Sequence, residues 1–220
     1  MRLLLIRHGQ TPSNILGLLD TAHPGPGLTS LGSAQAAAVP CSLRDRSPEA
    51  IFASTLIRTQ LTAGPLAAER DLPVQVLPGL HEIEAGTLEG LSDRESVRTY
   101  METVFAWVQG DLGAVMPGAA NGHAFFDRFD ADIARIAATT QTAVAFSHGA
   151  SIRVWTAMRA VNIPPMFTAQ HDLDNTGIAE LTGSPEAGWT LQSWAGRPVG
   201  GGALTDPAAS DPMGDAIDSV

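Results

Sequence analysis

Short apolar runs recur along the chain and predict strands. Six such runs lie at 2–6, 50–54, 74–77, 143–147, 177–182 and 189–194. The runs RLLLI and AVAFS, at 2–6 and 143–147, are apolar almost throughout. Runs of this length and composition are typical of strands that are covered on both faces of a sheet.

The stretches between these runs predict helices. They are the alanine-rich segment up to Pro40 and residues 56–70, 93–109, 124–138 and 150–161. Thr29 or Ser30 can cap the first of these helices. Pro40 predicts the end of that helix or a kink, and Pro65 predicts a break in the next, because proline lacks the amide hydrogen that a helix interior uses.

Strands and helices alternate along the chain, and this order predicts the fold class. We expect an α/β fold, a three-layer α/β/α sandwich around a mostly parallel sheet of about six strands. No internal repeat divides residues 1–196, so we expect one domain there. Residues 197–220 are rich in Gly, Pro, Ala and Asp, which predicts a flexible C-terminal tail.

Composition and charge narrow the classes of partner. The chain has 220 residues, of which 44% are hydrophobic and 16% charged, and its formal net charge is −10. This charge, without a cluster of Lys and Arg, argues against nucleic acid as a partner. No apolar stretch approaches the roughly 20 residues of a membrane span, and the N-terminal run is too short for the core of a signal peptide. We therefore expect no membrane partner.

The single cysteine, Cys41, excludes an intramolecular disulfide. Such cysteine usage fits a reducing compartment, and we expect a cytoplasmic location. Free cysteines behave as small hydrophobic side chains, so we expect Cys41 to be buried.

Three of the predicted strands lead to residues suited to binding an anion. The first runs into Arg7 and His8, the second leads to Arg58, and the fourth ends at His148 and Gly149. Because ligands bind beyond the carboxyl ends of strands in open α/β sheets, we expect these side chains to meet. Arg binds phosphate through a planar fork, and a helix that opens at Gly149 would add N–H donors. The sequence therefore predicts a phosphate pocket.

The segments around these residues resemble the motifs of one family, in order along the chain. RHGQTPSN (7–14) resembles R-H-G-[EQ]-T-x-x-N, the signature of the histidine phosphatase superfamily, whose best-known members are the cofactor-dependent phosphoglycerate mutases. The further matching segments are LTSLGSAQA (28–36), STLIRTQLTA (54–63), LHEIEAGTLEG (80–90), FSHGASIR (146–153) and DNTGIAEL (174–181). The resemblance implies a single phosphoglycerate-mutase-like domain over residues 1–196.

The resemblance also implies a role for each pocket residue. His8 would be the nucleophile that attacks phosphorus and forms a phosphohistidine. Arg7 and Arg58 would hold the phosphoryl oxygens in place of a metal ion. His148 would be a second pocket histidine, either cationic or donating to the transferred group. Asn14 would contact the phosphate through its amide, and the alternative is a turn-forming role in the loop.

Glu82 is the general acid and base that the resemblance implies. It would protonate the leaving alkoxide and then accept a proton from water. Glu84 is the rival, because alternation along an extended segment would place it on the same side as Glu82. His171 and Asp172 resemble the donor motif of the acid-phosphatase branch, but they stand in a different context, and we interpret His171 as a rim residue.

The sequence predicts neither a metal nor a cofactor. No two of its six histidines have the i,i+4 spacing of a helical metal-binding motif. We assign no catalytic role to His23, His81 and His123.

The favoured function is hydrolysis of a small phosphorylated substrate by a histidine phosphatase. The segment after the acid motif carries only Arg94 and Arg98 as basic residues, whereas phosphoglycerate mutases have a more basic insertion there. The alternatives are a cofactor-dependent phosphoglycerate mutase and a non-catalytic phosphate-binding or scaffold protein on the same fold.

Two departures from the family pattern leave the natural substrate open: a segment at 117–128 and a lengthening of the first loop at AHPGPG (22–27), which would alter the mouth of the pocket. PGAANGHAFFDR (117–128) lacks the glutamate and serine of the P-G-G-E-S that many relatives carry. Phe105, Trp107 and Phe125 fit either the core or an apolar lid. The oligomeric state is open as well, with a homodimer as one alternative.

Overall fold

The structure is a computed structural model that describes residues 1–209 and 211–216. Its strands are β1 (Arg2–Arg7), β2 (Ala50–Ala53), β3 (Val74–Val76), β4 (Thr142–Ser147), β5 (Ile178–Ser184) and β6 (Gly188–Ala195). Its α-helices are α1 (Pro12–Leu16), α2 (Ser30–Ser42), α3 (Ile57–Arg70), α4 (Arg94–Val108), α5 (Gly122–Thr139) and α6 (Gly149–Arg159). Its 3₁₀ turns are η1 (Pro78–Leu80), η2 (Gly86–Leu88) and η3 (Gly202–Leu204).

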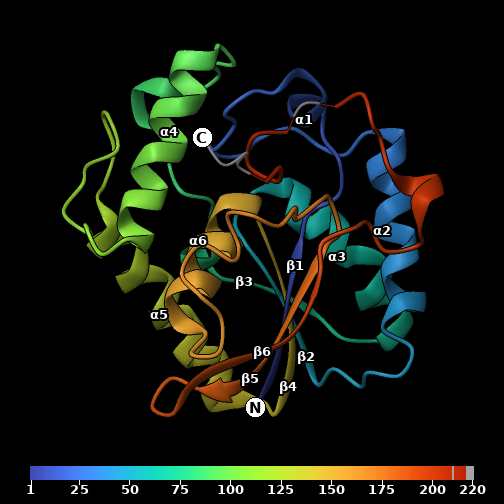
Figure 1. Cartoon of the computed structure of the whole chain (residues 1–220). Coiled ribbons are helices and arrows are strands. Elements are labelled where there is room, and N and C mark those ends of the chain that lie inside the picture. The colour runs from blue at the N-terminus through green and yellow to red at the C-terminus, as the bar shows by residue number, and fades with distance from the viewer. Residues whose placement is uncertain (210, 217–220) are drawn as a thin grey trace.

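A six-stranded sheet forms the middle layer of the molecule (Figure 1). The strand order is β3-β2-β4-β1-β5-β6. β1 pairs parallel with β4, β4 with β2, and β2 with β3. β5 pairs antiparallel with β1 on one side and with β6 on the other. The predicted α/β class with a mostly parallel sheet is confirmed.

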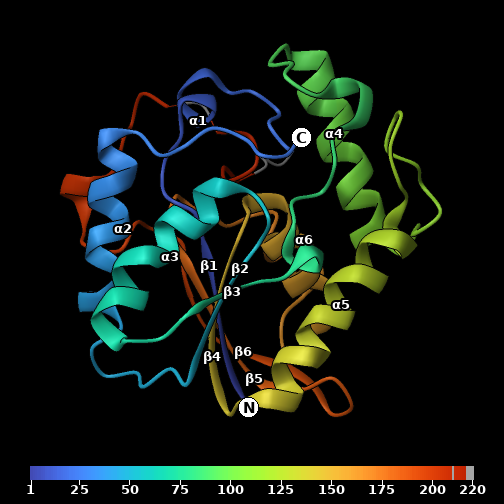
Figure 2. The ribbon, with the colours of Figure 1, turned by 180° about the vertical axis from the view of Figure 1, so that it is seen from behind.

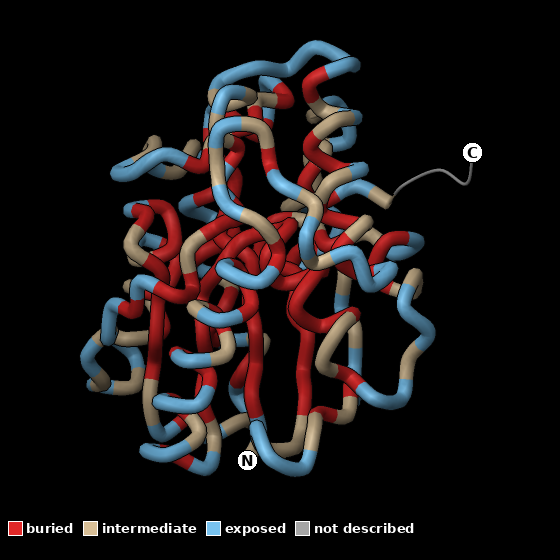
Figure 3. Tube along the Cα trace, turned by 90° about the vertical axis from the view of Figure 1, so that its left-hand side faces the viewer, coloured by how far each residue is buried: buried red, intermediate tan, exposed pale blue. Residues whose placement is uncertain are grey.

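Helices cover both faces of the sheet. α2 and α3 lie together on one face, and α4, α5 and α6 lie on the other (Figures 1 and 2). Alternate residues of β1 pack into two cores, with Leu3 and Leu5 in one and Leu4 and Ile6 in the other. The run LLLI is therefore apolar throughout because both of its faces are covered. β1, β2 and β4 are buried along most of their length, as the red segments in the middle of Figure 3 show, whereas β3 and β6 at the edges of the sheet are partly exposed.

The two prolines do not interrupt the helices as expected. α2 continues through Pro40 to Ser42, and α3 continues through Pro65 to Arg70. In α3, packing compensates for the missing hydrogen bond, since Ala63 and Leu66 on either side of the proline are fully buried. The cap at the start of α2 is as expected, because the side chain of Thr29 accepts from Gly32 N at 2.9 Å.

The expectation that Cys41 is buried is wrong. Cys41 lies exposed near the end of α2, where Val39 and Pro40 occupy the buried positions. The aromatic residues Phe105, Trp107 and Phe125 all belong to the core, which agrees with the first of the two interpretations given for them.

The C-terminal tail folds back onto the domain rather than leaving it, over the part that the structure describes. Gln10 Nε2 donates to Asp206 Oδ2 at 2.9 Å, and Leu173 N donates to Gly214 O at 2.8 Å. Arg153, fully buried in α6, donates from Nη1 to Asp215 O at 2.8 Å. Residues 197–209 and 211–216 therefore do not form the flexible tail that the composition predicts. Residues 210 and 217–220 lie outside the described residues.

Candidate active site

The register of three neighbouring strands brings the candidate residues to one edge of the sheet. Arg7 of β1 lies opposite Ser147 of β4, and Ala53 of β2 lies opposite Phe146 of β4. The residues that directly follow these paired positions therefore lie at a similar height along the sheet. They are His8, His148 and Ser54. This edge is at the top of Figure 1, where α1 and the C-terminal segment also lie.

The two histidine rings face each other in a buried site. Their centroids lie 5.2 Å apart in an edge-to-face arrangement, and His8 is 3% exposed and His148 0%. His8 Nδ1 lies 2.8 Å from Gly9 O, so this nitrogen carries the proton and Nε2 keeps its lone pair. Burial above all, and then Arg58 and Arg7, lower the pKa of His8 well below its ordinary value. His8 is thus held in the neutral form that a nucleophile needs.

His148 is also held neutral. Burial first and then the charge of Arg58 lower its pKa well below the ordinary value for histidine. Of the two roles expected for His148, a cation or a donor to the transferred group, its lowered pKa favours the neutral donor.

Arg7 and Arg58 are buried cations with N–H groups left over. Arg58 donates from Nη2 to Asp20 O at 2.8 Å. Arg7 donates from Nη1 to Leu173 O at 2.7 Å and pairs through Nη2 with the carboxylate of Asp211. Within the described residues, the Nε of Arg7 and the Nε of Arg58 have no hydrogen-bond partner, and Arg58 Nη1 has only an ion pair with Asp20 Oδ1 at 3.5 Å. Buried donors without acceptors are costly, and the oxygens of a bound phosphate would satisfy them.

Contacts from α2 and α3 fix the loop that carries His8. Gly9 N donates to Thr62 Oγ1 of α3 at 2.9 Å. A Cβ on Gly32 of α2 would lie 2.1 Å from Gln10 O, so the close approach of α2 to the loop requires glycine there. The two motifs around these residues therefore position the loop that carries His8.

Asn14 takes part in the local structure of the same loop. In the capping box at the start of α1, Asn14 Oδ1 accepts from Thr11 N at 2.9 Å. Asn175 Nδ2 donates both to Asn14 Oδ1 at 3.2 Å and to His8 O at 3.1 Å. The alternative loop role is therefore present, and a phosphate contact by Asn14 stays a prediction.

Glu82 is fully buried, and its carboxylate lies beside the first turn of α6. Its Oε1 accepts from Ile83 N at 2.9 Å and from Ser151 N at 2.8 Å, and its Oε2 accepts from Ala150 N at 3.1 Å. Ala150 N and Ser151 N in the first turn of α6 therefore bind Glu82. The N–H of Gly149 is not one of these donors, and its contact with phosphate stays a prediction.

Gly149 itself is needed for close packing. A Cβ there would lie 2.5 Å from Met213 O of the tail and 3.1 Å from Arg7 Nε. Any larger residue would therefore disturb both the tail and the guanidinium of Arg7.

Glu84 does not lie on the same side as Glu82. Glu84 is exposed, whereas Glu82 is buried. The expected alternation fails because the segment is not a strand and turns into η2 just after Ala85. The structure thus separates the two carboxylates that the sequence left as competitors.

Sequence reasoning missed several residues that contact the candidate residues. Ser54 Oγ lies 2.6 Å from His148 Nε2. Arg128 donates from Nη2 to Glu82 O at 2.7 Å, and the ring of His81 lies 6.2 Å from that of His148. Ser54, His81 and Asn175 lie within the family motifs at 54–63, 80–90 and 174–181, and this position in the sequence could have indicated that they belong to the site.

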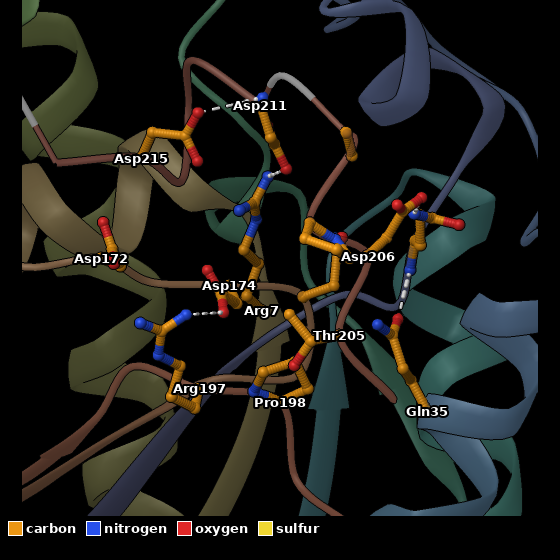
Figure 4. A pocket seen from close by; sticks show the side chains of 14 residues that line it. Arg7, Gln35, Asp172, Asp174, Arg197, Pro198, Thr205, Asp206, Asp211 and Asp215 are labelled. Atoms are coloured by element: carbon orange, nitrogen blue, oxygen red, sulfur yellow. Dashed lines mark hydrogen bonds and ion pairs between the residues drawn. The ribbon is translucent and has the colours of Figure 1, made fainter. Parts of the chain in front are cut away.

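The tail closes over Arg7 beside a polar cavity of about 220 Å³ (Figure 4). In this view the Asp211 carboxylate points at the end of the Arg7 side chain, and Asp215, to the left, accepts from Asp211 N at 3.1 Å. Burial and the neighbouring Asp211 raise the pKa of Asp215. An acidic segment thus occupies one N–H group of an arginine that the sequence assigns to phosphate.

His171, interpreted from the sequence as a loop or rim residue, lies in a loop. It is exposed, stacks on Phe167 and has Nδ1 at 2.7 Å from Phe167 O. Among residues 1–209 and 211–216, no group of three or more His, Cys, Asp or Glu side chains is arranged to hold a metal ion. In that same part of the chain, no helix is both long and apolar enough to cross a membrane.

The fold and the site define an α/β protein in which two buried histidines lie beside two buried arginines. The chain belongs to the histidine phosphatase superfamily, since the model of branch 1 of this superfamily matches residues 3–196. The resemblance found in the sequence motifs is confirmed.

Two relatives in sequence cover different shares of the chain. A PE-PGRS family protein of Mycobacterium tuberculosis is 43% identical over 216 residues, which are 90% of this chain and 37% of that protein. The adenosylcobalamin/alpha-ribazole phosphatase of Escherichia coli is 36% identical over 136 residues, which are 62% of this chain and 66% of that protein. The chain therefore spans less than two thirds of the length of both relatives.

A solved structure shares the fold over nearly its whole length. The mycobacterial glucosyl-3-phosphoglycerate phosphatase in complex with VO3 superposes with a TM-score of 0.74 and 26% identity, covering 89% of this chain and 99% of that one.

Proposed function

We propose that the chain is a phosphomonoesterase that hydrolyses a small phosphorylated metabolite through a phosphohistidine on His8. One observation carries the proposal: a histidine with a free Nε2 lies among buried arginine N–H groups that lack acceptors. Phosphoryl transfer needs this combination, because charge spreads over three equatorial oxygens while a nucleophile attacks phosphorus.

The reaction has two steps. His8 Nε2 attacks phosphorus, the bond from phosphorus to the ester oxygen breaks, and Glu82 gives its proton to that oxygen. Water then attacks the phosphohistidine and gives a proton back to Glu82, and the bond from nitrogen to phosphorus breaks to release phosphate. Arg7 and Arg58 hold the phosphoryl oxygens in both steps and supply the positive charge.

Glu82 is the carboxylate we propose as acid and base. It is buried at the same end of α6 as His148, whereas Glu84 is exposed. Arg128 donates to the backbone carbonyls of both His81 and Glu82, at 2.7 Å each, which fixes the segment that carries the carboxylate.

The proposed substrates are phosphate esters of small molecules. The relatives include an adenosylcobalamin/alpha-ribazole phosphatase and a glucosyl-3-phosphoglycerate phosphatase. Arg94 and Arg98 are exposed on α4, so they do not form the basic pocket that a phosphoglycerate carboxylate would need. Hydrolysis is therefore favoured over mutase activity.

We also propose a cytoplasmic location. The exposed thiol of Cys41 has no disulfide partner among the described residues, which suits a reducing compartment.

The test is turnover of para-nitrophenyl phosphate and of a panel of phosphorylated metabolites, with released phosphate as the readout. We expect the chain to release phosphate in the presence of EDTA, and His8→Ala to lose activity by several orders of magnitude. His171→Ala is the matched control, because this histidine is exposed and outside the pocket, and it should keep full activity. Undiminished release by His8→Ala would overturn the proposal, and release that depends on a bisphosphoglycerate primer would favour the mutase.

A further inference from the structure

Ser54 is the buried serine at the end of β2, and the proposed mechanism does not use it. It follows the register pair of Ala53 and Phe146, and its backbone N–H donates to Phe146 O at 3.1 Å. This pairing with β4 places Ser54 beside His148, which follows Ser147 at the end of that strand. The side chain of Ser54 is 0% exposed, so no solvent competes for its hydroxyl.

The Ser54 hydroxyl has one proton to donate and three neighbouring polar atoms. Its Oγ lies 2.6 Å from His148 Nε2 and 3.2 Å from Thr59 Oγ1, and it accepts from Leu56 N at 3.2 Å. The proton of Thr59 is already used, because Thr59 Oγ1 donates to Leu56 O at 2.7 Å. The shortest remaining contact for the Ser54 proton is therefore His148 Nε2.

The opposite assignment differs at the other ring nitrogen. If His148 Nε2 carried the proton, it would donate to Ser54 Oγ across the same 2.6 Å, and the Ser54 proton would go to Thr59 Oγ1 at 3.2 Å. His148 Nδ1 would then present a lone pair, which cannot bind an anionic oxygen, whereas the first assignment leaves an N–H there.

We propose that Ser54 is a positioning residue that donates to His148 Nε2 and so fixes the proton of the neutral ring on Nδ1. Within the described residues, His148 Nδ1 is buried and has no hydrogen-bond partner. An N–H in this position is the donor that remains for a phosphoryl oxygen. The catalytic part of this inference rests on the proposed function, and the assignment of the proton requires only that an anionic oxygen binds at Nδ1.

His148 is suited to this arrangement because it is held neutral. Its ring lies 5.2 Å from that of His8, and burial and Arg58 both lower its pKa. A neutral imidazole has one N–H and one lone pair, so the partner of one ring nitrogen decides what the other can do. His8 shows the same principle, with Gly9 O as the partner.

The first experiment is ¹⁵N NMR of the histidine rings in the full chain, free and with inorganic phosphate. With inorganic phosphate bound, we expect the His148 signals of the wild type to show a protonated Nδ1 and an unprotonated Nε2, and Ser54→Ala to lose this preference. Ser147→Ala is the matched control, since Ser147 is equally buried on the neighbouring strand and donates to Leu80 O at 2.7 Å. It should leave the His148 signals unchanged. A proton on Nε2 in the phosphate-bound wild type would overturn the inference.

The second experiment compares the kinetics of the same variants. Ser54→Ala should lower kcat by roughly tenfold to a hundredfold with little change in KM, because the lost donor acts on the transition state. Ser54→Thr keeps the hydroxyl and should recover most of the rate, whereas Ser147→Ala should stay near the wild type. Equal losses in Ser54→Ala and Ser147→Ala would indicate a structural role and contradict the inference.

The two experiments separate this inference from the proposed function. If His8→Ala retains full turnover while His148 shows a protonated Nδ1, the proposed function fails and the positioning role of Ser54 stands. If turnover depends on His8 but the proton lies on Nε2, the function stands and the inference fails.

Discussion

Asp211→Asn should make the protein bind inorganic phosphate more tightly. The Asp211 carboxylate pairs with Nη2 of Arg7, and Arg7 is the guanidinium that we assign to the phosphoryl oxygens. A phosphate that takes this N–H group must displace the carboxylate. The substitution removes the competing charge and keeps the shape of the side chain.

The size of the effect follows from the burial of the pair. The side chains of Arg7 and Asp211 are 1% and 12% exposed, so the pair is only slightly screened. A hydrogen bond between charged groups contributes about 1.5–3 kcal/mol, and we discount this to about 1–2 kcal/mol because Asp211 lies near the surface. The inhibition constant of phosphate should therefore fall by roughly fivefold to thirtyfold.

The assay is competitive inhibition of para-nitrophenyl phosphate hydrolysis by inorganic phosphate. Asp206→Asn is the control, because it removes the same charge from the same tail but contacts Gln10 rather than Arg7. The tail should stay in place in both variants, since Arg153 still donates to Met213 O and Asp215 O. Equal inhibition constants for the wild type and Asp211→Asn, or equal shifts in both variants, would refute the reasoning.

Three further predictions concern Glu82, the histidines and Gly32. Glu82→Gln should slow hydrolysis of alkyl phosphates by about a hundredfold or more. Hydrolysis of para-nitrophenyl phosphate should slow far less, because its leaving group needs less protonation. Equal losses for both substrates in steady-state assays would indicate a structural role for Glu82 at α6. In urea unfolding, stability should fall as the pH drops below about 6.5, because the pKa values of His8 and His148 are lowered in the folded state and the unfolded chain binds more protons there. His8→Asn should reduce that slope by about 1.4 kcal/mol per pH unit, and an unchanged slope would contradict the lowered pKa of His8. Gly32→Ala should lower the melting temperature, because its Cβ would lie 2.1 Å from Gln10 O. Gly64→Ala is the control, since a Cβ there meets no atom within 4 Å, and its melting temperature should not fall. An unchanged melting temperature for Gly32→Ala would be evidence against the close approach of α2 to the loop at Gln10.

Much of the fold was predictable because its signals are local. The run LLLI marks a strand covered on both faces, and its two cores are the reason for that pattern. The ends of such strands carry Arg7, His8 and His148, and parallel strands share one edge, so their convergence followed from order along the chain. The helix breaks at Pro40 and Pro65 were wrong because tertiary packing outweighs the loss of one backbone hydrogen bond.

The details of the site depend on register and on long-range contacts that the sequence does not display. Ser54 meets His148 only because β2 and β4 pair with Ala53 opposite Phe146. The alternation that grouped Glu82 with Glu84 assumed an extended segment, which the chain does not form there. Composition likewise suggested a flexible tail, since it cannot reveal that Arg153, buried in α6, binds the backbone of that tail.

The most direct measurement is trapping of the phosphoenzyme. The chain is mixed with substrate, quenched within the first turnover and digested under conditions that preserve phosphohistidine, and the modified residue is located by mass spectrometry. We expect one phosphoryl group on His8 and none in His8→Ala. Hydrolysis at full rate with no phosphoryl group on His8, or with the group on another residue, would contradict the account.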